Sequence, residues 1–231
     1  MSRLTSSFRA YSRWLLKPLM IVFVEGPDGS GKSTLISHLA PLLAGSGRTV
    51  HVADPLWTYM PMIRAPSDFD PWVQSTAGED VAVALLDAMA RRVAALGVSQ
   101  LGSDDIVLVD RGPKTVLCSA RAHLQTGLRA PGRMTPLVKA RQDLLTQHVA
   151  DLAKVAQLRS IEFSVPHDPA ATIRRLTVAE RSSPAYLRYL RALSHEMAST
   201  RFRVPSELRL WLPMNESIRT NVQRSAAWLL D

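Results

Sequence analysis

The feature that most constrains this chain is a glycine-rich break in an apolar run near its start. Residues 20–25 are MIVFVE, residues 26–34 are GPDGSGKST, and residues 35–40 are LISHLA. An apolar run that ends in glycines and continues with helical spacing predicts a buried strand, a tight loop and a helix. Within this stretch Gly26, Gly31, Lys32 and Ser33 fit the pattern G-x-x-x-x-G-K-[ST]. The residues from 26 to 31 are called the glycine loop below.

This pattern predicts a site for a polyphosphate. Glycines allow successive backbone N–H groups to turn inward around the anion, and the following helix points its positive end at the same place. Lys32 would reach the β- and γ-phosphates, and Ser33 would place its hydroxyl on Mg²⁺. We therefore expect ATP and Mg²⁺ as cofactors. The residues expected to bind the nucleotide are Gly26, Asp28, Gly29, Ser30, Gly31, Lys32, Ser33 and Thr34.

Strands and helices are predicted to alternate along the rest of the chain. Apolar or β-branched runs predict strands at 20–25, 49–53, 106–110, 160–165 and 208–212. This order predicts an α/β, three-layer P-loop NTPase fold with a five-stranded parallel sheet, whose ligands lie at the carboxyl ends of the strands.

The segments between these strands are predicted to be mostly helical. The helix after the glycine loop is expected to end at Gly45 and Gly47, and the next, from 81 to 96, at Gly97. Asn215 is expected to cap a last helix that runs to residue 228. Residues 66–80 are polar and contain prolines, which predicts a loop over the ligand cleft. Further helices are expected at 113–125, 136–157, 168–180 and 184–199.

The length of 231 residues suits one α/β domain, which we place at 20–231 with a lid at about 168–188. Residues 1–19 contain four basic residues and no acidic residue, and apolar side chains recur there at helical spacing. This predicts a basic amphipathic arm. A transit peptide, a membrane-surface anchor, a polyanion-binding arm and a helix packed on the domain remain alternatives.

Composition restricts the cellular compartment and the binding partners that we expect. The single cysteine, Cys118, excludes a disulfide within the chain and fits a reducing compartment, so we expect a cytoplasmic location. No apolar run is long enough to cross a bilayer, so no transmembrane segment is expected. The net charge of +8 favours polyanionic partners, with DNA as an alternative to solubility alone. A homodimer is compatible with the sequence.

Three short segments resemble thymidylate kinases. They are residues 22–34 (VFVEGPDGSGKST), residues 107–111 (VLVDR) and residues 163–166 (FSVP), and the likeness extends over about 20–231. The resemblance implies that Asp110 holds Mg²⁺ or its water and that Arg111 meets the acceptor or the moving phosphoryl group. It also implies that lid arginines close on the phosphates and stabilise the transition state, namely Arg174, Arg175 and Arg181.

The chain departs from that family at the positions that contact the acceptor. Gly112 stands where a tyrosine usually follows Asp-Arg, and Ser119-Ala120 stands where a Tyr-Gln pair is usual. Residues 54–57 (DPLW) look instead like the Glu-Pro and tryptophan pattern of deoxynucleoside kinases. That likeness implies that Asp54 acts as the base on an acceptor hydroxyl. Trp57, Tyr59 and Trp72 are candidates for stacking a base, and Asp28 for binding a sugar hydroxyl.

These observations favour an ATP- and Mg²⁺-dependent kinase that transfers the γ-phosphate to a nucleotide or nucleoside. One alternative is a kinase acting on a hydroxyl of a modified pyrimidine, of the 5-hydroxymethyluracil type, in DNA. Another is a non-kinase P-loop ATPase. A GTP switch is disfavoured because the sequence contains no Asn-Lys-x-Asp guanine signature.

Overall fold

The computed structural model describes residues 19–98, 101–127, 132–164, 173, 183–200, 202 and 208–231. These residues form an α/β structure with one five-stranded sheet, in which every pairing is parallel. In chain order the elements are β1 (Met20–Glu25), α2 (Lys32–Ala44), β2 (Val50–Val52), the 3₁₀ helices η2 (Leu56–Tyr59) and η3 (Pro66–Asp68), α3 (Phe69–Ser75), α4 (Gly78–Val98), β3 (Ile106–Asp110), α5 (Pro113–Thr126), α6 (Pro136–Leu152), β4 (Gln157–Phe163), α9 (Pro184–Ser199), β5 (Leu208–Leu212) and α10 (Ile218–Leu230).

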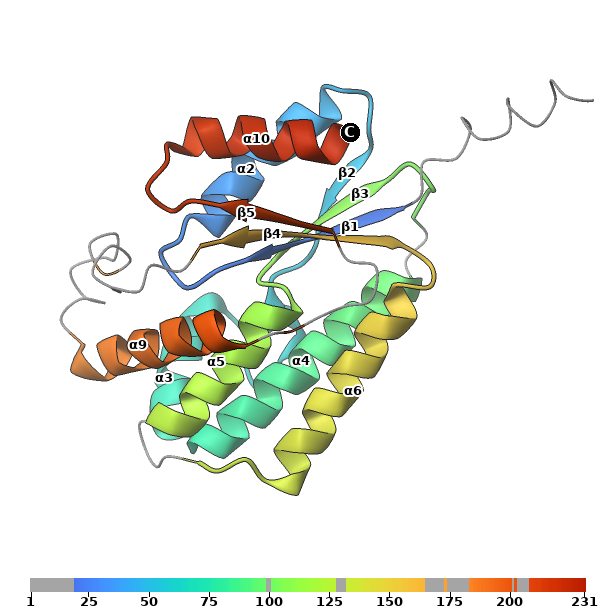
Figure 1. Cartoon of the computed structure of the whole chain (residues 1–231). Helices are drawn as coiled ribbons and strands as arrows, with labels where there is room; N and C mark the ends of the chain where they lie inside the picture. The colour runs from blue at the N-terminus through green and yellow to red at the C-terminus, as the bar shows by residue number, and fades with distance from the viewer. Residues whose placement is uncertain are drawn as a thin grey trace, which may run out of the picture.

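Helices cover both faces of the sheet, which gives three layers (Figure 1). Helices α2 and α10 lie on one face, and α3, α4, α5, α6 and α9 lie on the other. Each face has its own apolar core, because alternate residues of a strand point in opposite directions. Val22 and Val24 pack with α2 and α10, whereas Ile21 and Phe23 pack toward α4, α5 and α6. All six residues of β1 are therefore buried.

The strand order is β2-β3-β1-β4-β5, so β1 lies at the centre of the sheet. It pairs with β3 on one side and with β4 on the other. In this register Val24 lies opposite Asp110, and Glu25 lies opposite Glu162. The glycine loop, which follows β1, is thereby placed beside the carboxyl end of β3. This arrangement brings Asp110 next to the start of α2.

The structure corrects two predictions about helices in the first half of the chain. Residues 66–80 are not a simple loop, because they contain η3 and α3 as well as the start of α4 at Gly78. Helix α4 also continues past Gly97 to Val98. Leu96, the residue before Gly97 in this helix, is buried in the core.

In the second half, predictions about one strand and two helices are wrong. The strand predicted at 160–165 is β4, which spans Gln157–Phe163. Helix α6 ends at Leu152 and not at residue 157, because residue 157 already pairs with Met20 as the first residue of β4. The cap of the last helix is Ser217 and not Asn215. The hydroxyl of Ser217 accepts a hydrogen bond from the backbone N–H of Thr220 at 3.1 Å, which satisfies one of the free donors of the first turn.

The predicted arm at 1–19 lies outside the described residues except for Leu19, and so does most of the predicted lid at 168–188. In the part of the chain that the structure describes, no helix is both long enough and apolar enough to cross a membrane.

Candidate functional site

The glycine loop has a backbone that other residues would adopt only with strain. Gly26 has a φ of 156° and Gly31 a φ of 95°. A Cβ atom on Gly26 would lie 2.7 Å from Ser30 Oγ and 3.1 Å from Phe163 Cβ. The loop is therefore packed tightly against the end of β4. Ser30 N donates to Pro27 O at 3.2 Å, which closes the turn that leads into α2.

Lys32 begins α2 and is only 5% exposed. Its Nζ donates to the carbonyl oxygen of Pro27 at 2.8 Å, so the side chain folds back over the glycine loop. Burial lowers the pKa of Lys32 to about 8. A buried ammonium that donates a hydrogen bond to a neutral carbonyl favours an anionic ligand in the loop, since a nearby negative charge offsets its desolvation.

Ser33 and Asp110 form a second polar pair beside this lysine. Ser33 Oγ donates to Asp110 Oδ2 at 2.5 Å, although the two residues are far apart in sequence. The other oxygen, Asp110 Oδ1, is buried without a hydrogen-bond partner among the described residues. A hydroxyl and a carboxylate are hard oxygen ligands of the kind that Mg²⁺ takes. These two residues fit the metal role that the sequence predicts for them.

The described residues contain no cluster of three or more histidine, cysteine or acidic side chains that would hold a metal alone. This agrees with Mg²⁺ chemistry, because Mg²⁺ is usually bound by one or two protein oxygens together with phosphate oxygens and water. An orphaned oxygen on Asp110 next to the Ser33 hydroxyl is the observation that supports such a site.

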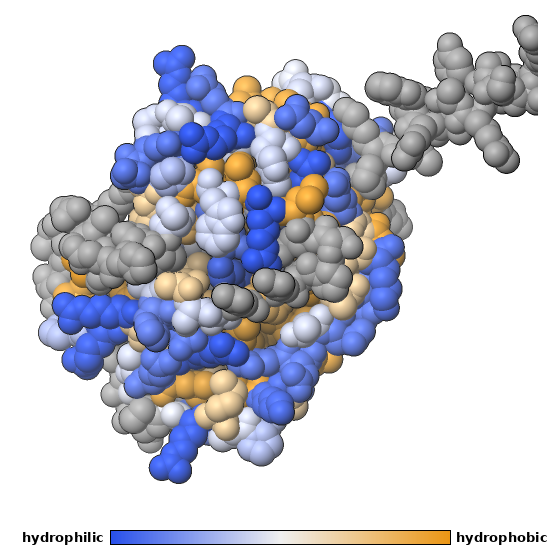
Figure 2. Space-filling view, in the orientation of Figure 1, coloured by the Kyte–Doolittle hydropathy of each residue, from blue (hydrophilic) through white to orange (hydrophobic). Residues whose placement is uncertain are grey.

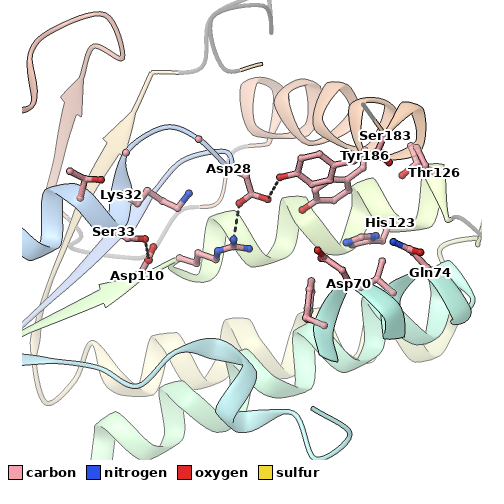
Figure 3. A pocket seen from close by; sticks show the side chains of 18 residues that line it. Asp28, Lys32, Ser33, Asp70, Gln74, Asp110, His123, Thr126, Ser183 and Tyr186 are labelled. Carbon is pink, nitrogen blue, oxygen red and sulfur yellow. Dashed lines mark hydrogen bonds and ion pairs between the residues drawn. The ribbon is translucent and has the colours of Figure 1, made fainter. Parts of the chain in front are cut away.

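Arg111 and Asp28 form an ion pair that links β3 to the glycine loop (Figure 3). Arg111 Nη2 lies 2.9 Å from Asp28 Oδ1, and the hydroxyl of Tyr186 donates to Asp28 Oδ2 at 3.3 Å. Burial opposes ionisation of Asp28, but the charges of Arg111 and Lys32 outweigh it and hold the pKa of that carboxyl below its usual range. Asp28 is thus an ionised carboxylate at the mouth of the loop.

Arg92 is a fully buried arginine that holds the strand ends in place. Its Nη1 donates to the carbonyl of Asp110 at 2.7 Å and to that of Arg111 at 3.5 Å, and its Nη2 donates to the carbonyl of Ala53 at 3.5 Å. Arg111 has a φ of 61°, which is rare for a residue other than glycine. The guanidinium of Arg92 therefore donates hydrogen bonds to the carbonyls on both sides of the Arg111 Cα and to the carbonyl of Ala53, the residue after β2.

Glu25 connects the glycine loop to α5. Its carboxylate accepts from the backbone N–H groups of Lys114 at 3.0 Å and Thr115 at 2.8 Å, and from the Thr115 hydroxyl. These are free donors at the start of a helix, which a carboxylate satisfies well. Thr115 Oγ1 in turn accepts from Gly26 N at 3.0 Å. The first residue of the loop is thereby tied to the first turn of α5.

A cavity of about 620 Å³, called the main cavity below, opens beside these residues (Figure 3). Residues from the glycine loop, the start of α2, the end of β3, α3, α5 and α9 line it. The lining residues are Asp28, Gly29, Gly31, Lys32, Ser33, Thr34, Phe69, Asp70, Val73, Gln74, Asp110, Arg111, His123, Thr126, Ser183, Ala185, Tyr186 and Tyr189. The region 66–80 does cover a cavity, but it does so with α3.

Aromatic rings form one wall of the main cavity. His123 stacks on Tyr189 with ring centroids 4.4 Å apart, and Tyr186 stacks on Tyr189 at 5.9 Å. Burial lowers the pKa of His123 to about 4, so its ring is neutral at physiological pH. Tyr189 is held by a 2.7 Å hydrogen bond between its hydroxyl and Ser119 Oγ. A fixed wall of this kind suits a flat aromatic ligand.

A second cavity of about 420 Å³ lies against the same loop. Asn221 of α10 is 2% exposed and donates from Nδ2 to Pro213 O at 3.2 Å, whereas its Oδ1 is buried without a hydrogen-bond partner among the described residues. Gly29, Gly31 and Thr34 line both cavities. The remaining lining residues of the second cavity are Ser30, Phe163, Glu216, Ile218 and Asn221.

The predicted site residues fall into three groups. The loop residues that the sequence predicts to bind a nucleotide, together with Asp110 and Arg111, lie together as described above. Asp54 is exposed and is not among the residues that line either cavity. Trp57 and Trp72 do not line them either, and both pack on the core. The predicted lid residues Arg174, Arg175 and Arg181 lie outside the described residues.

Several residues at the site were not predicted. Tyr186 and Tyr189 are three residues apart in a segment whose helical spacing was recognised, so a shared helix face was a signal for them. Arg92 interrupts an apolar helical run, which was a weaker signal. His123 carried no signal in the sequence.

Comparison with models of known protein families gives no match for this chain, and comparison with curated proteins gives none either.

Proposed function

We propose that this protein is an ATP- and Mg²⁺-dependent kinase of the P-loop NTPase type, which transfers the γ-phosphate of ATP to a nucleotide or nucleoside. The single observation that carries the proposal is the pairing of Ser33 Oγ with Asp110 Oδ2 at 2.5 Å, directly beside the buried Lys32. A glycine loop followed by Lys-Ser needs such a carboxylate from a neighbouring strand to organise the metal.

The residues of the site have distinct roles in this proposal. Bound ATP and Mg²⁺ supply the phosphoryl group and offset the charge that develops as it transfers. The backbone N–H groups of the glycine loop would bind the phosphates, and Lys32 would neutralise charge between the β- and γ-phosphates. Ser33 and Asp110 would hold the metal. Arg92 would keep Asp110 in position through its backbone carbonyl.

The two cavities suit the two substrates. Lys32, Ser33 and Asp110 line the main cavity and do not line the second one. The reacting end of the phosphate chain therefore faces the main cavity, and the acceptor is assigned there, against the wall formed by Tyr186, Tyr189 and His123. The base of the donor nucleotide is assigned to the second cavity.

A modified pyrimidine in DNA is a second candidate acceptor, and one observation favours it. The exposed face of α9 carries Arg188, Arg191 and His195 at helical spacing. The same helix supplies Tyr186 and Tyr189 to the main cavity. Two arginines on the outer face of a helix beside the acceptor cavity suit contact with a phosphate backbone.

The test is a transfer assay with ATP labelled on the γ-phosphate and a panel of acceptors: TMP, free deoxynucleosides, and duplex DNA containing 5-hydroxymethyluracil. We expect labelled product from at least one acceptor and its loss in Lys32→Ala, with an unchanged circular dichroism spectrum. Lys139→Ala, an exposed lysine on α6, is the matched control and should keep the wild-type rate. ATP hydrolysis without transfer to any acceptor would favour the non-kinase ATPase instead.

A further inference from the structure

The charges that line the main cavity distinguish between types of acceptor. The described lining includes three carboxylates, Asp28, Asp70 and Asp110, against two cations, Lys32 and Arg111. His123 adds no charge because its pKa is about 4. In the proposed kinase Lys32 serves the donor phosphates, and Arg111 is already paired with Asp28 at 2.9 Å.

This balance disfavours a monophosphate as the acceptor. A phosphate group entering the main cavity would bring about two negative charges at pH 7 next to the ionised Asp28. The described lining offers no cation for it that is not already engaged by Asp28 or assigned to the donor. A neutral hydroxyl carries no such penalty, and it needs a carboxylate nearby to accept its proton.

Asp28 is the carboxylate best placed for that task. It lies in the glycine loop that leads into Lys32, and Figure 3 shows it between Lys32 and Tyr186, whereas Asp70 lies across the cavity on α3. Asp110 is engaged by Ser33. Glu25 is covered by the start of α5 and lines neither cavity.

The contacts of Asp28 hold its side chain in place and leave the carboxylate able to accept a further hydrogen bond. Arg111 bonds one carboxylate oxygen and Tyr186 bonds the other. An ionised carboxylate has about four lone-pair positions, so each oxygen keeps capacity for a further hydrogen bond. An acceptor hydroxyl that donates to Asp28 would lie beside the Lys32 amine, where the γ-phosphate is expected.

We propose, on the basis of the kinase function above, that the acceptor group is a hydroxyl and that Asp28 is the base that receives its proton. The acceptor oxygen forms a bond to the γ-phosphorus, and the bond between that phosphorus and the β–γ bridging oxygen breaks. The electron pair of the broken bond leaves with ADP. The hydroxyl proton passes to the Asp28 carboxylate and then to water, so atoms and charge balance.

The first experiment identifies the bond formed by the wild-type protein and depends on no variant. ATP and Mg²⁺ are supplied with deoxynucleosides, with 5-hydroxymethyldeoxyuridine, with duplex DNA containing 5-hydroxymethyluracil, or with deoxynucleoside monophosphates, and the products are analysed by ³¹P NMR. We expect a new phosphate monoester from a hydroxyl acceptor. A new diphosphate as the main product would overturn the inference and leave the kinase function standing. Transfer to none of these acceptors would overturn both.

The second experiment tests Asp28 with the hydroxyl acceptor that the first identifies. Asp28→Asn keeps the size of the side chain and should lower kcat by about 10² to 10⁴, the usual worth of a general base, with KM for ATP changed by less than about threefold. Asp143→Asn, an exposed carboxylate on α6, is the charge-matched control and should keep the wild-type kcat.

The variant Tyr186→Phe distinguishes the effect of losing the Asp28 carboxylate from the effect of losing a contact that positions it. It removes the hydrogen bond to Asp28 Oδ2 and retains the carboxylate, so we expect a loss of kcat smaller than that of Asp28→Asn. A wild-type kcat in Asp28→Asn would rule out the base role. A raised KM for ATP at unchanged kcat would likewise contradict it, because that pattern assigns Asp28 to donor binding.

Discussion

Asp110 carries one oxygen bonded to Ser33 and another buried without a described partner. Asp110→Asn should keep the volume of the side chain but remove the charge that would organise Mg²⁺ in the proposed kinase. We expect the transfer rate to fall by at least about 10², with a higher Mg²⁺ concentration needed for half-maximal rate. The measurement is the rate as a function of Mg²⁺ concentration. The control is Asp104→Asn, which changes an exposed carboxylate ahead of β3. If the rate depends on Mg²⁺ concentration in the same way for wild type and Asp110→Asn, the role of Asp110 is structural.

Glu25 should make the stability of the fold depend on pH. Burial raises its pKa from 4.5 to about 7, against the lowering effect of its hydrogen bonds from Thr115, while the neighbouring Glu162 raises it further. Glu162 itself forms ion pairs with Lys114 and Arg209. Because the folded state holds this proton more tightly than the unfolded state, the free energy of unfolding should fall as pH rises from about 4.5 to about 7. The contribution is roughly 3 kcal/mol.

This pH dependence can be isolated with Glu25→Gln. The variant should be less stable overall, because its amide NH₂ would face the N–H donors of α5. Its free energy of unfolding, measured by urea denaturation at several pH values, should nevertheless lack the decline that Glu25 causes. Parallel curves for wild type and variant between pH 4.5 and 7 would contradict the assignment.

At the scale of single residues, the sequence predicted what local patterns determine. The glycine-loop pattern was enough to select Lys32 and Ser33 as candidate site residues. The place of Asp110 at the end of a buried apolar strand was enough to select that residue. The aromatic wall could not be predicted from local patterns, because it depends on how α9 packs on α5. The predicted position of Asp54 illustrates the same limit. The strand before it ends at Val52, one residue earlier than predicted, and Asp54 lies at an exposed position outside both cavities.

At the scale of elements, the turn between β3 and α5 has no room for a side chain at Gly112. A Cβ atom there would lie 2.3 Å from Glu25 Oε1 and 2.6 Å from Phe23 Cβ. Glu25 and Phe23 therefore occupy the space that a side chain at position 112 would need. Gly112→Ala should therefore destabilise the fold by about 1–3 kcal/mol, as overpacking does.

The measurement for Gly112→Ala is urea denaturation followed by circular dichroism. Gly45→Ala is a matched control, because Gly45 has a φ of −62° and its Cβ atom would lie at least 3.4 Å from its neighbours. That variant should be neutral or slightly stabilising, by up to about 1 kcal/mol. A Gly112→Ala variant as stable as Gly45→Ala would show that the turn relaxes at no cost.

The predicted bounds were right where local signals mark both ends of an element. Helix α9 and strand β5 have the predicted bounds, and α9 starts with Ser183 as its cap and Pro184 as its first residue. The bounds were wrong where tertiary contacts decide. Helix α6 ends early because pairing with β1 extends β4 toward the N-terminus. Gly97 does not end α4, which continues to Val98.

At the scale of the whole molecule, the net charge of +8 predicts weak attraction to nucleic acid at low salt. Hydrophilic residues cover most of the face shown in Figure 2, with apolar patches between them. For the DNA candidate, Arg188→Ala/Arg191→Ala should reduce the slope of log affinity against log salt by about 2, since each phosphate contact contributes about 0.9. Fluorescence anisotropy with a labelled duplex at several salt concentrations measures this slope.

The control for that pair removes the same charge elsewhere. Lys139→Ala/Arg219→Ala alters exposed residues on α6 and α10. If this variant lowers the slope as much as the α9 variant does, the attraction comes from overall charge and α9 has no special role in it. A wild-type slope near zero would leave the basic residues with a role in solubility.

The central position of β1 also affects how the chain reaches its fold during synthesis. Both neighbours of β1 come much later in the chain, since Met20 pairs with Ile106 of β3 and with Gln157 of β4. A chain emerging from the ribosome therefore exposes this apolar strand long before either partner is available. Pairings so distant in sequence are slow to form, and unpaired apolar strands aggregate. Nascent chains that stop before β4 should consequently depend on chaperones, because β1 then lacks the neighbour that carries Gln157.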